Sequence, residues 1–314
     1  MAKYILKRLA MAVVSLFAIT AIIFILLRQM PIEGYLGAAV EKMSPEAIEN
    51  SLRQMGLLDP VHIQLKNFYV DVFHGDLGES MVYRPHVPIT EIIAPKIPIS
   101  LGFGFAALCL ALLVGLPLGI MMSRSKGGIP DKLGTGFIVL LNAVPMVVFY
   151  LFIQIYGSRA TGIPMLFSRS DWRTWILPVI CLSLSNIANY AMWMRRYMVD
   201  QLNADYVKLA MAKGVSSKKI MYKHVFRNAF VPMLQLLPSS FLLTIMGSIY
   251  IESLFSIPGM GGLLIDVIKR QDNTMVQALV LIYACMGIIG LLLGDILMAL
   301  GDPRIKLDQK GGAR

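Results

Sequence analysis

Charge and cysteine are both scarce in this chain of 314 residues. Asp, Glu, Lys and Arg make up 15% of it, whereas soluble domains average about 25% charged residues. Together with 56% apolar residues, this shortage excludes an ordinary soluble enzyme and a disordered protein. The three cysteines, Cys109, Cys181 and Cys285, all lie inside apolar runs. They offer neither a disulfide framework nor a metal-ligand spacing, and we interpret them as small core residues.

Catalytic and nucleotide-binding motifs are also missing. The sequence contains no HExxH, the zinc-protease signature, and no GxSxG, the nucleophile turn of hydrolases. It contains no GxxxxGK followed by Ser or Thr, so we do not expect the chain itself to bind ATP. His62, His74 and His86 recur every twelve residues, which is not a ligand spacing. We therefore predict no catalytic residue, no metal site and no cofactor bound by this chain.

Two acidic residues lie near apolar segments without forming a pair. An intramembrane aspartyl protease needs two carboxylates that share a proton. We expect Asp295 to stand alone at the inner end of the last apolar segment, and Glu252 to lie a membrane thickness away, at the outer end of the fifth. Glu252 is interpreted as a helix-end charge. Charge rings and a potassium-channel filter sequence are absent as well.

Long uncharged segments dominate what is present. A helix needs roughly 20 residues to cross a hydrocarbon core of about 30 Å. The windows of at least 19 residues without Asp, Glu, Lys or Arg are 9–27, 97–123, 133–158, 174–194, 228–251 and 273–294. These runs are continuous rather than alternating, which excludes a β-barrel. The sequence thus predicts an all-α, polytopic membrane protein with six transmembrane helices.

The first apolar window has two interpretations. A basic start, with Lys3, Lys7 and Arg8, followed by apolar residues resembles a signal peptide. The apolar run is longer than such a region usually is, and no pair of small residues marks a cleavage site. We therefore expect a retained first helix, with Arg28 reaching to the interface at its outer end.

The distribution of basic residues predicts the orientation. With the N-terminus placed in the cytoplasm, the inner segments hold 18 of the 29 Lys and Arg residues. Their basic density is about 2.5-fold that of the outer segments, as the positive-inside rule expects. Both termini are then cytoplasmic, and the protein is expected to cross the membrane several times. The net charge of +10 is explained by topology and anionic lipid, so no nucleic-acid partner is expected.

The chain divides into three predicted regions. Residues 1–29 form the N-terminal segment and first span, 30–96 an extracytoplasmic helical region, and 97–314 a core of five helices. In the outer region, Ser44 and Gly56 are typical of the start and stop of one short helix. A second helix is expected from Pro60 to Gly75. These helices form either a structural cap or a docking surface for an external partner.

The polar inner segment 203–227 is the most informative part of the chain. Asp205 follows Asn203 and Ala204 at the expected start of a helix that ends at Gly214, and Ser216 or Ser217 starts a second helix from about Lys218 to Phe226. Lysines alternate with apolar residues along this helix–glycine–helix elbow. It suits either a knob that inserts into a groove of a soluble partner or a basic loop on lipid headgroups.

Uncharged polar residues inside the predicted spans are candidates for lining a pathway. They suit a hydrated path, and they equally suit hydrogen bonds between helices. The candidate pathway-lining residues are Asn142, Ser183, Asn186, Asn189 and Ser239.

Several segments together resemble a known family. The elbow sequences DYVKLAMAKG (205–214) and HVFRNAFVP (224–232) resemble the EAA loop of bacterial ABC importer permeases, in the form of the dipeptide/oligopeptide branch. The segments MGLLDP (55–60) and HGDLGES (74–80) resemble the outer region of that branch's first permease subunit, the B-type subunit. ESLFSIPGMG (252–261) and GDPRI (301–305) resemble its fifth-loop and C-terminal motifs.

This resemblance implies a type I ABC importer permease fold and a non-catalytic subunit that forms half of a peptide translocation pathway. The partners implied are a second permease subunit in a heterodimer, two cytosolic ABC ATPases that hold ATP and Mg²⁺, and an extracytoplasmic peptide-binding protein. The residues that coupling to the ATPases would use are Asp205, Tyr206, Lys208, Ala210, Ala212, Lys213, Gly214, Val215, Lys218, Ile220, His224 and Arg227.

Two other functions stay open at this point. The same architecture could carry a nickel chelate or another small solute. A stand-alone channel or a membrane enzyme would be a different class, active without any ATPase.

Overall fold

The computed structural model describes residues 2–30, 33–36, 40, 42–245 and 249–301. Almost all of this part of the chain is helical. The described strands are the two-residue segments β1 (Glu79–Ser80) and β2 (Val87–Pro88), which pair antiparallel. The all-α fold class is confirmed.

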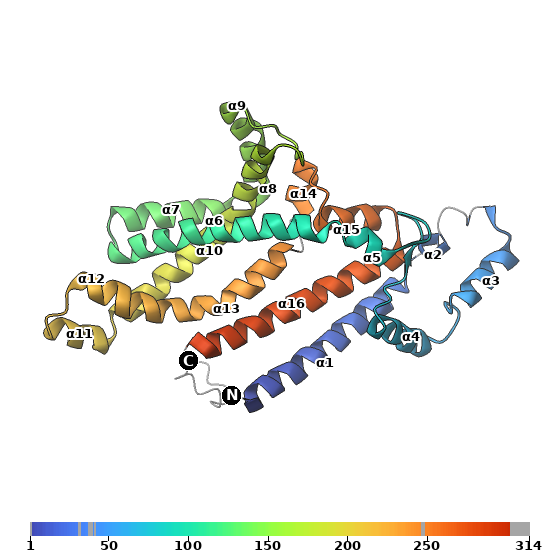
Figure 1. Ribbon diagram of the computed structural model, residues 1–314, viewed down its shortest axis with the longest axis horizontal. Coiled ribbons are helices and arrows are strands. Elements are labelled where there is room, and N and C mark those ends of the chain that lie inside the picture. Colours follow the sequence, from blue (N-terminus) through green and yellow to red (C-terminus); the bar gives the residue numbers. More distant parts are fainter. Residues whose placement is uncertain (1, 31–32, 37–39, 41, 246–248, 302–314) are drawn as a thin grey trace.

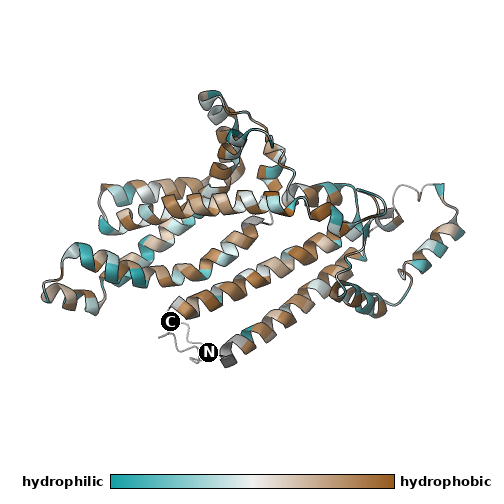
Figure 2. Ribbon diagram, in the orientation of Figure 1, coloured by the Kyte–Doolittle hydropathy of each residue, from teal (hydrophilic) through white to brown (hydrophobic). Residues whose placement is uncertain are grey.

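Five long helices run along the molecule (Figure 1). They are α1 (Ala2–Leu27), α6 (Ile97–Arg124), α10 (Ile176–Leu202), α13 (Phe226–Ile245) and α16 (Asn273–Gly301). Figure 2 shows that apolar residues predominate along the middle of these helices and hydrophilic residues gather towards the two ends of the molecule. Among the described residues, four helices are long and apolar enough to cross a membrane, or up to six if each of two bent pairs is one span.

The third predicted span is not one straight helix. It consists of α7 (Ile129–Ala143), then α8 (Met146–Phe152), the π-helix η2 (Ile153–Gly157) and α9 (Ser158–Thr161). The second part is bent by 101° from the first. The bend falls at Pro145, because a proline drives the residue before it out of the helical region. Val144 accordingly has an extended backbone, with φ −101° and ψ 134°.

The fifth predicted span also consists of more than one element. It runs as α13 and then α14 (Ile249–Phe255), and residues 246–248 between them lie outside the described part. After α14 the chain turns by 91° into α15 (Met260–Lys269). Gln154 of η2 donates a hydrogen bond to the carbonyl of Leu254, with the atoms 2.7 Å apart. The two bent segments are therefore held together at this end.

The outer region contains the two short helices that the sequence predicts. α3 (Pro45–Gln54) begins after Ser44, whose hydroxyl accepts a hydrogen bond from the Ala47 amide at 3.2 Å. α4 (Val61–Phe73) follows, and α2 (Glu33–Leu36) and α5 (Ile89–Ile93) complete the region. Gly56 and Gly75 have φ of +66° and +81°, the left-handed conformation in which glycine ends a helix.

α4 packs against the outer part of α1. The hydroxyl of Tyr69 donates to the carbonyl of Phe17 at 2.9 Å, and the two rings meet edge to face with centroids 4.8 Å apart. The Phe68 and Phe24 rings lie 5.4 Å apart. These contacts make α4 part of a structural cap on α1, and docking of an external partner stays a prediction.

Glycines bring the long helices of the core close together. A Cβ atom on Gly119 of α6 would lie 2.6 Å from the carbonyl oxygen of Ala191 on α10. One on Gly294 of α16 would lie only 2.2 Å from the carbonyl oxygen of Gln235 on α13. No side chain fits there, so these glycines fix the approach of two helix pairs.

The start of α1, the end of α16 and the polar elbow lie at one end of the molecule, and α2–α5 lie at the other (Figure 1). This is the arrangement that an even number of crossings requires. The assignment of the first end to the cytoplasm stays a prediction from the distribution of Lys and Arg.

Candidate functional site: the polar elbow and the buried polar clusters

The elbow is a helix, a glycine turn and a second helical arm. α11 (Asp205–Ala212) ends where Gly214 has φ +72°, and α12 (Ser217–Lys219) continues as the π-helix η4 (Ile220–Val225). A Cβ on Gly214 would meet nothing within 4 Å, so the glycine is required by its backbone conformation and not by crowding.

One expectation about this elbow was wrong. The second arm does not stop near Phe226, because η4 passes directly into α13. The second arm and α13 therefore form one continuous helical segment. Both helices begin where the sequence predicts, after Ala204 and Ser216, but neither of these residues makes a capping hydrogen bond with its side chain. The turn at Gly214, not capping, separates the two arms.

The buried face of the elbow is part of the protein core. Val207, Ile220 and Val225 are buried and pack in one cluster with Met194 and Met198 of α10. Ile220, which was assigned to coupling, is 2% exposed and therefore holds the elbow in place instead of contacting a partner. A force on the elbow would be transmitted to α10 and α13 through this packing.

The exposed surface of the elbow combines apolar side chains with lysines. Leu209 and Met211 of α11 are 56% and 58% exposed. Lys208 pairs with Asp205 at 2.8 Å on this surface. The remaining exposed coupling candidates are Ala212, Lys213, Lys218 and Arg227, while Tyr206, Ala210, Val215 and His224 are half-buried. The exposed surface of the elbow is thus mostly polar and includes the two apolar side chains Leu209 and Met211.

An ion pair fixes α7 to α10 near the elbow. Arg195 donates from Nη2 to Asp131 Oδ2 at 2.7 Å, and Asp131 also accepts from the Gly127 amide at 2.8 Å. Asp131 is only 4% exposed. Because a buried carboxylate is stable only with such partners, this pair locks the two helices together. The sequence analysis did not find this pair, and 64 residues separate its members.

Glu252 is not a helix-end charge, as the sequence suggested. It is buried, accepts a hydrogen bond from Ser100 Oγ at 2.9 Å through one oxygen, and accepts another from the Gly262 amide at 2.9 Å through the other. Ser100 Oγ in turn accepts from the Met260 amide at 2.9 Å. This cluster ties α6, α14 and the start of α15 together and holds the 91° turn.

The partners that the structure gives Asp295 are an amide and a basic side chain, and neither is the second carboxylate that a protease would need. The Asp295 carboxylate accepts a hydrogen bond from Gln235 Nε2 at 3.0 Å and pairs with Arg8 Nη1 at 3.2 Å. Three helices, α1, α13 and α16, therefore meet at this carboxylate.

Asp272 forms a further buried cluster at the outer end. Its Oδ2 accepts hydrogen bonds from Ser80 Oγ at 2.6 Å and from the amides of Val82 and Tyr83 at 3.0 and 2.9 Å. An Asp directly before a helix is typical of a helix start, so the sequence could have predicted a capping role for Asp272. The long-range partners could not be read from the sequence.

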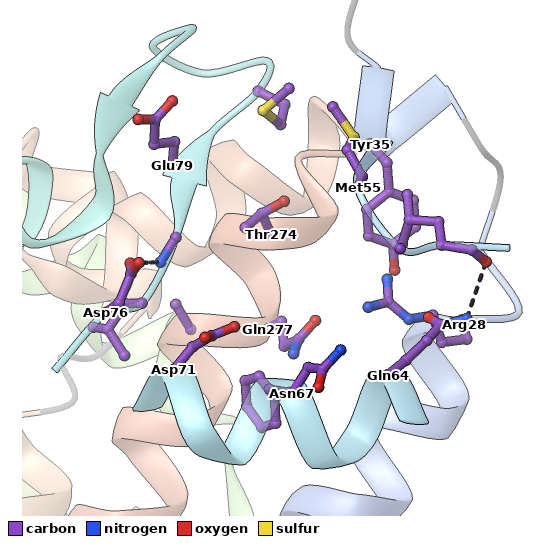
Figure 3. Close-up of a pocket in the computed structure, with 17 residues that line it drawn as sticks. Arg28, Tyr35, Met55, Gln64, Asn67, Asp71, Asp76, Glu79, Thr274 and Gln277 are labelled. Carbon is purple, nitrogen blue, oxygen red and sulfur yellow. Dashed lines mark hydrogen bonds between the residues drawn. The ribbon is translucent and has the colours of Figure 1, made fainter. Parts of the chain in front are cut away.

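A cavity of about 280 Å³ lies at the outer end, between the end of α1, the helices α2–α4 and the start of α16 (Figure 3). Figure 3 shows Arg28 and Gln64 at one end, Asp71 and Asp76 at the other, and the amides of Asn67 and Gln277 between them. This cavity could not be predicted from the sequence, since its walls come from four separate segments.

The sequence matches two related families of transport proteins over most of its length. Residues 115–307 match the family described as the inner membrane component of binding-protein-dependent transport systems, and residues 1–96 match the N-terminal family of the same transport components. The chain belongs to this family. This inner membrane component is thus a membrane protein, and the family resemblance drawn from the elbow and the outer-loop motifs is confirmed.

Curated relatives carry peptide-transport names. This inner membrane component is 34% identical over 311 residues to the dipeptide transport system permease protein DppB of Lactococcus lactis, covering 98% of this chain and all of that one. It is 41% identical over 212 residues to the oligopeptide transport system permease protein AmiC of Streptococcus pneumoniae. That match covers 67% of this chain and 42% of the length of AmiC.

Solved structures support the fold. A chain of the MetNI methionine ABC transporter matches with a TM-score of 0.53 at 11% identity, over 68% of this chain and 97% of that one. A chain of an amino acid ABC transporter matches with a TM-score of 0.51 at 16% identity, over 68% and 94%. The inner membrane component therefore has the ABC transporter permease fold.

The candidate pathway-lining residues are not brought together on one surface. Ser183 is fully buried and donates to the carbonyl of Ile180 in its own helix, so it reaches no surface of this chain. Ser239 lies where α13 packs against Gly290 of α16. Asn142 and Asn189 are exposed, and Asn186 and Ser239 are half-buried, so a role of these four residues in lining a pathway stays a prediction.

Proposed function

We propose that this inner membrane component is one permease half of an ATP-driven importer of small peptides. The other half of the pathway would be a second permease subunit, and two cytosolic ABC ATPases would hold the ATP and Mg²⁺. The chain itself would bind no nucleotide. The peptide substrate is supported by the names of its relatives DppB and AmiC, which are described as dipeptide and oligopeptide permeases.

The observation that carries the proposal is the construction of the elbow. One face of α11 and η4 is buried against α10, and α11 also exposes the apolar side chains of Leu209 and Met211 among lysines. A rigid helical knob that exposes apolar side chains suits the groove of a soluble subunit better than headgroups. The direct passage from η4 into α13 supports mechanical coupling, because a displaced elbow would move that helix as a unit.

The mechanism follows from these contacts. Closure of the ATPases would push the elbow and tilt α10 and α13, so that the pathway opens outward. An external binding protein would release a peptide into it, and ATP hydrolysis would return the pathway to the inward-open state. Gly214 keeps the angle between the two arms fixed during this movement.

The test is association with the ATPases. Leu209→Asp would replace an exposed apolar side chain of the elbow with a charge, and we expect the ATPase subunits to be lost on co-purification and ATP-dependent uptake of labelled dipeptide to stop. The matched control is Leu58→Asp, because Leu58 is 50% exposed at the opposite end of the molecule. It should keep the ATPases. Retention of the ATPases by Leu209→Asp would refute the elbow assignment.

A second experiment addresses coupling instead of assembly. Gly214→Pro would fix φ near −65°, although the turn requires a positive φ. We expect the complex to assemble in the membrane and hydrolyse ATP without transporting peptide. Wild-type uptake by this variant would count against the proposed role of the turn.

A nickel chelate is the alternative substrate class from the sequence. Among the relatives described, the named cargoes are peptides, and these include the glutathione permease protein GsiC of Salmonella typhimurium at 31% identity over 307 residues. Uptake of labelled dipeptide and of nickel, measured in the same vesicles, separates the two. A stand-alone channel would instead conduct solute without ATPases.

A further inference from the structure

We propose that the outer cavity binds a small zwitterion with a free ammonium group and a free carboxylate, namely an amino acid or a dipeptide. The cavity of about 280 Å³ is just below the usual size range of small-molecule sites, which begins at about 300 Å³. Its chemical polarity, not its size, identifies the ligand class. The choice of a dipeptide as probe rests on the proposed function, whereas the polarity does not.

Gln64 lies at the same end of the cavity as Arg28, and its amide is fixed in one orientation. Gln64 is 8% exposed, and its Nε2 donates to the carbonyls of Leu57 at 3.0 Å and Asp59 at 2.6 Å. Two carbonyls can only accept, so the amide nitrogen must face them and Oε1 is left without a partner. Oε1 is buried, as is Nε of Arg28, which also has no hydrogen-bond partner among the described residues.

Arg28 supplies a positioned positive charge at this end. Its guanidinium carbon lies 4.5 Å from the centre of the Phe24 ring and 4.9 Å from that of Tyr35. In the described part of the chain, no carboxylate lies within 4.0 Å of its nitrogen atoms. Two rings therefore hold the group in place without neutralising it, and a guanidinium in that state suits a ligand carboxylate.

The other end of the cavity is acidic. Asp71 of α4 and Asp76 after the Gly75 turn lie together there, opposite Arg28 (Figure 3). Asp76 Oδ1 accepts a hydrogen bond from the Gly78 amide at 2.7 Å, which fixes its position. An ammonium group fits this end, and the amides of Asn67 and Gln277 between the two ends suit the polar middle of the same ligand.

The experiment uses the full-length chain in lipid nanodiscs, with the subunits that co-purify, and without nucleotide or binding protein. The probes are the dipeptide Ala-Leu, its N-acetyl form, its C-terminal amide and free leucine, titrated by calorimetry. We expect at least one free zwitterion, Ala-Leu or leucine, to bind, and a free dipeptide to bind at least tenfold more tightly than either capped form.

Two variants test which end of the cavity binds the carboxylate of the ligand and which end binds its ammonium group. Arg28→Gln should remove the preference for the free carboxylate and keep the preference for the free ammonium group. Asp71→Asn combined with Asp76→Asn should do the reverse. Arg53→Gln is the matched control, because Arg53 pairs with Glu49 on the exposed face of α3 and does not line the cavity. It should change neither preference.

Failure of this proposal and failure of the proposed function give different results. Absence of binding by both free zwitterions, or unchanged preferences in both cavity variants, would overturn the cavity assignment even if ATP-driven peptide uptake is normal. Selective binding without any peptide uptake would leave the cavity assignment intact and refute the transport proposal. Arg28→Lys, which keeps the charge, should retain the preference for the free carboxylate and excludes a mere folding defect.

Discussion

The carboxylate of Glu252 on α14 accepts a hydrogen bond from Ser100 Oγ on α6 at 2.9 Å, although 152 residues separate the two. Through Ser100 this contact reaches the Met260 amide, and the second carboxylate oxygen reaches the Gly262 amide. One buried side chain thereby organises the turn between α14 and α15. The motif ESLFSIPGMG, which carried part of the family resemblance, is the sequence of this turn.

Replacing Glu252 should disrupt this turn. Glu252→Ala leaves the Ser100 hydroxyl and the Gly262 amide without their acceptor, and each buried donor left unsatisfied costs about 1–3 kcal/mol. We expect a clear loss of thermal stability in detergent. Glu91→Gln on the exposed face of α5 is the control and should leave the unfolding temperature unchanged. Equal stability of both variants would contradict a structural role for the cluster.

Two glycines beside Glu252 should respond differently to the same added methyl group. A Cβ on Gly259 would lie 2.4 Å from Glu252 Oε1, whereas one on Gly262 would meet nothing closer than 3.8 Å. Gly259→Ala should therefore destabilise the protein by about 1–3 kcal/mol through overpacking. Gly262→Ala should change little. Thermal unfolding of the two variants side by side measures the difference, and the opposite order would refute the geometry.

The approach of α6 to α10 should depend on Gly119. Its Cβ would clash with the carbonyl oxygen of Ala191, a backbone atom that cannot rotate away. Gly119→Val should separate the two helices and lower expression and thermal stability. Gly136→Val is the control, because a Cβ there meets nothing within 4 Å. Unchanged behaviour of Gly119→Val would show that the helices do not pack this closely.

The pair of Asp131 and Arg195 should show strong coupling. Arg195→Met alone leaves a buried carboxylate without its cation and should cost about 3–5 kcal/mol. Asp131→Leu together with Arg195→Met removes both charges, and it should recover most of the lost stability. A double-mutant cycle by thermal unfolding measures this. Simple additivity of the two single effects would mean that the pair is not coupled.

Local signals in the sequence predicted much of the fold. The short outer helices begin and end at Ser44, Gly56 and Gly75 as expected, because capping and a left-handed glycine are properties of a few neighbouring residues. The glycine turn of the elbow was found for the same reason. The bend at Pro145 was not predicted. A proline is tolerated inside a transmembrane helix when neighbouring groups satisfy the freed backbone carbonyls, so its presence alone does not show whether the helix bends or by how much.

The buried polar clusters could not be predicted. Glu252 and Asp295 were judged by their neighbours along the chain, and Asp131 was not singled out, because the partners of all three come from other helices. The outer cavity was missed for the same reason, since Arg28 and Asp71 line one cavity only when α4 folds back along α1.

Hydropathy and local sequence patterns by themselves determined that this protein is a helical membrane component with a polar elbow at one end. Membrane spans, turns and the distribution of charge depend on residues that are close together in the sequence. Which carboxylates are buried, where two of the apolar segments bend and what surrounds Arg28 were decided only by the tertiary structure. These features depend on contacts between residues far apart in the chain, and the energy of a buried charge is set by the groups around it.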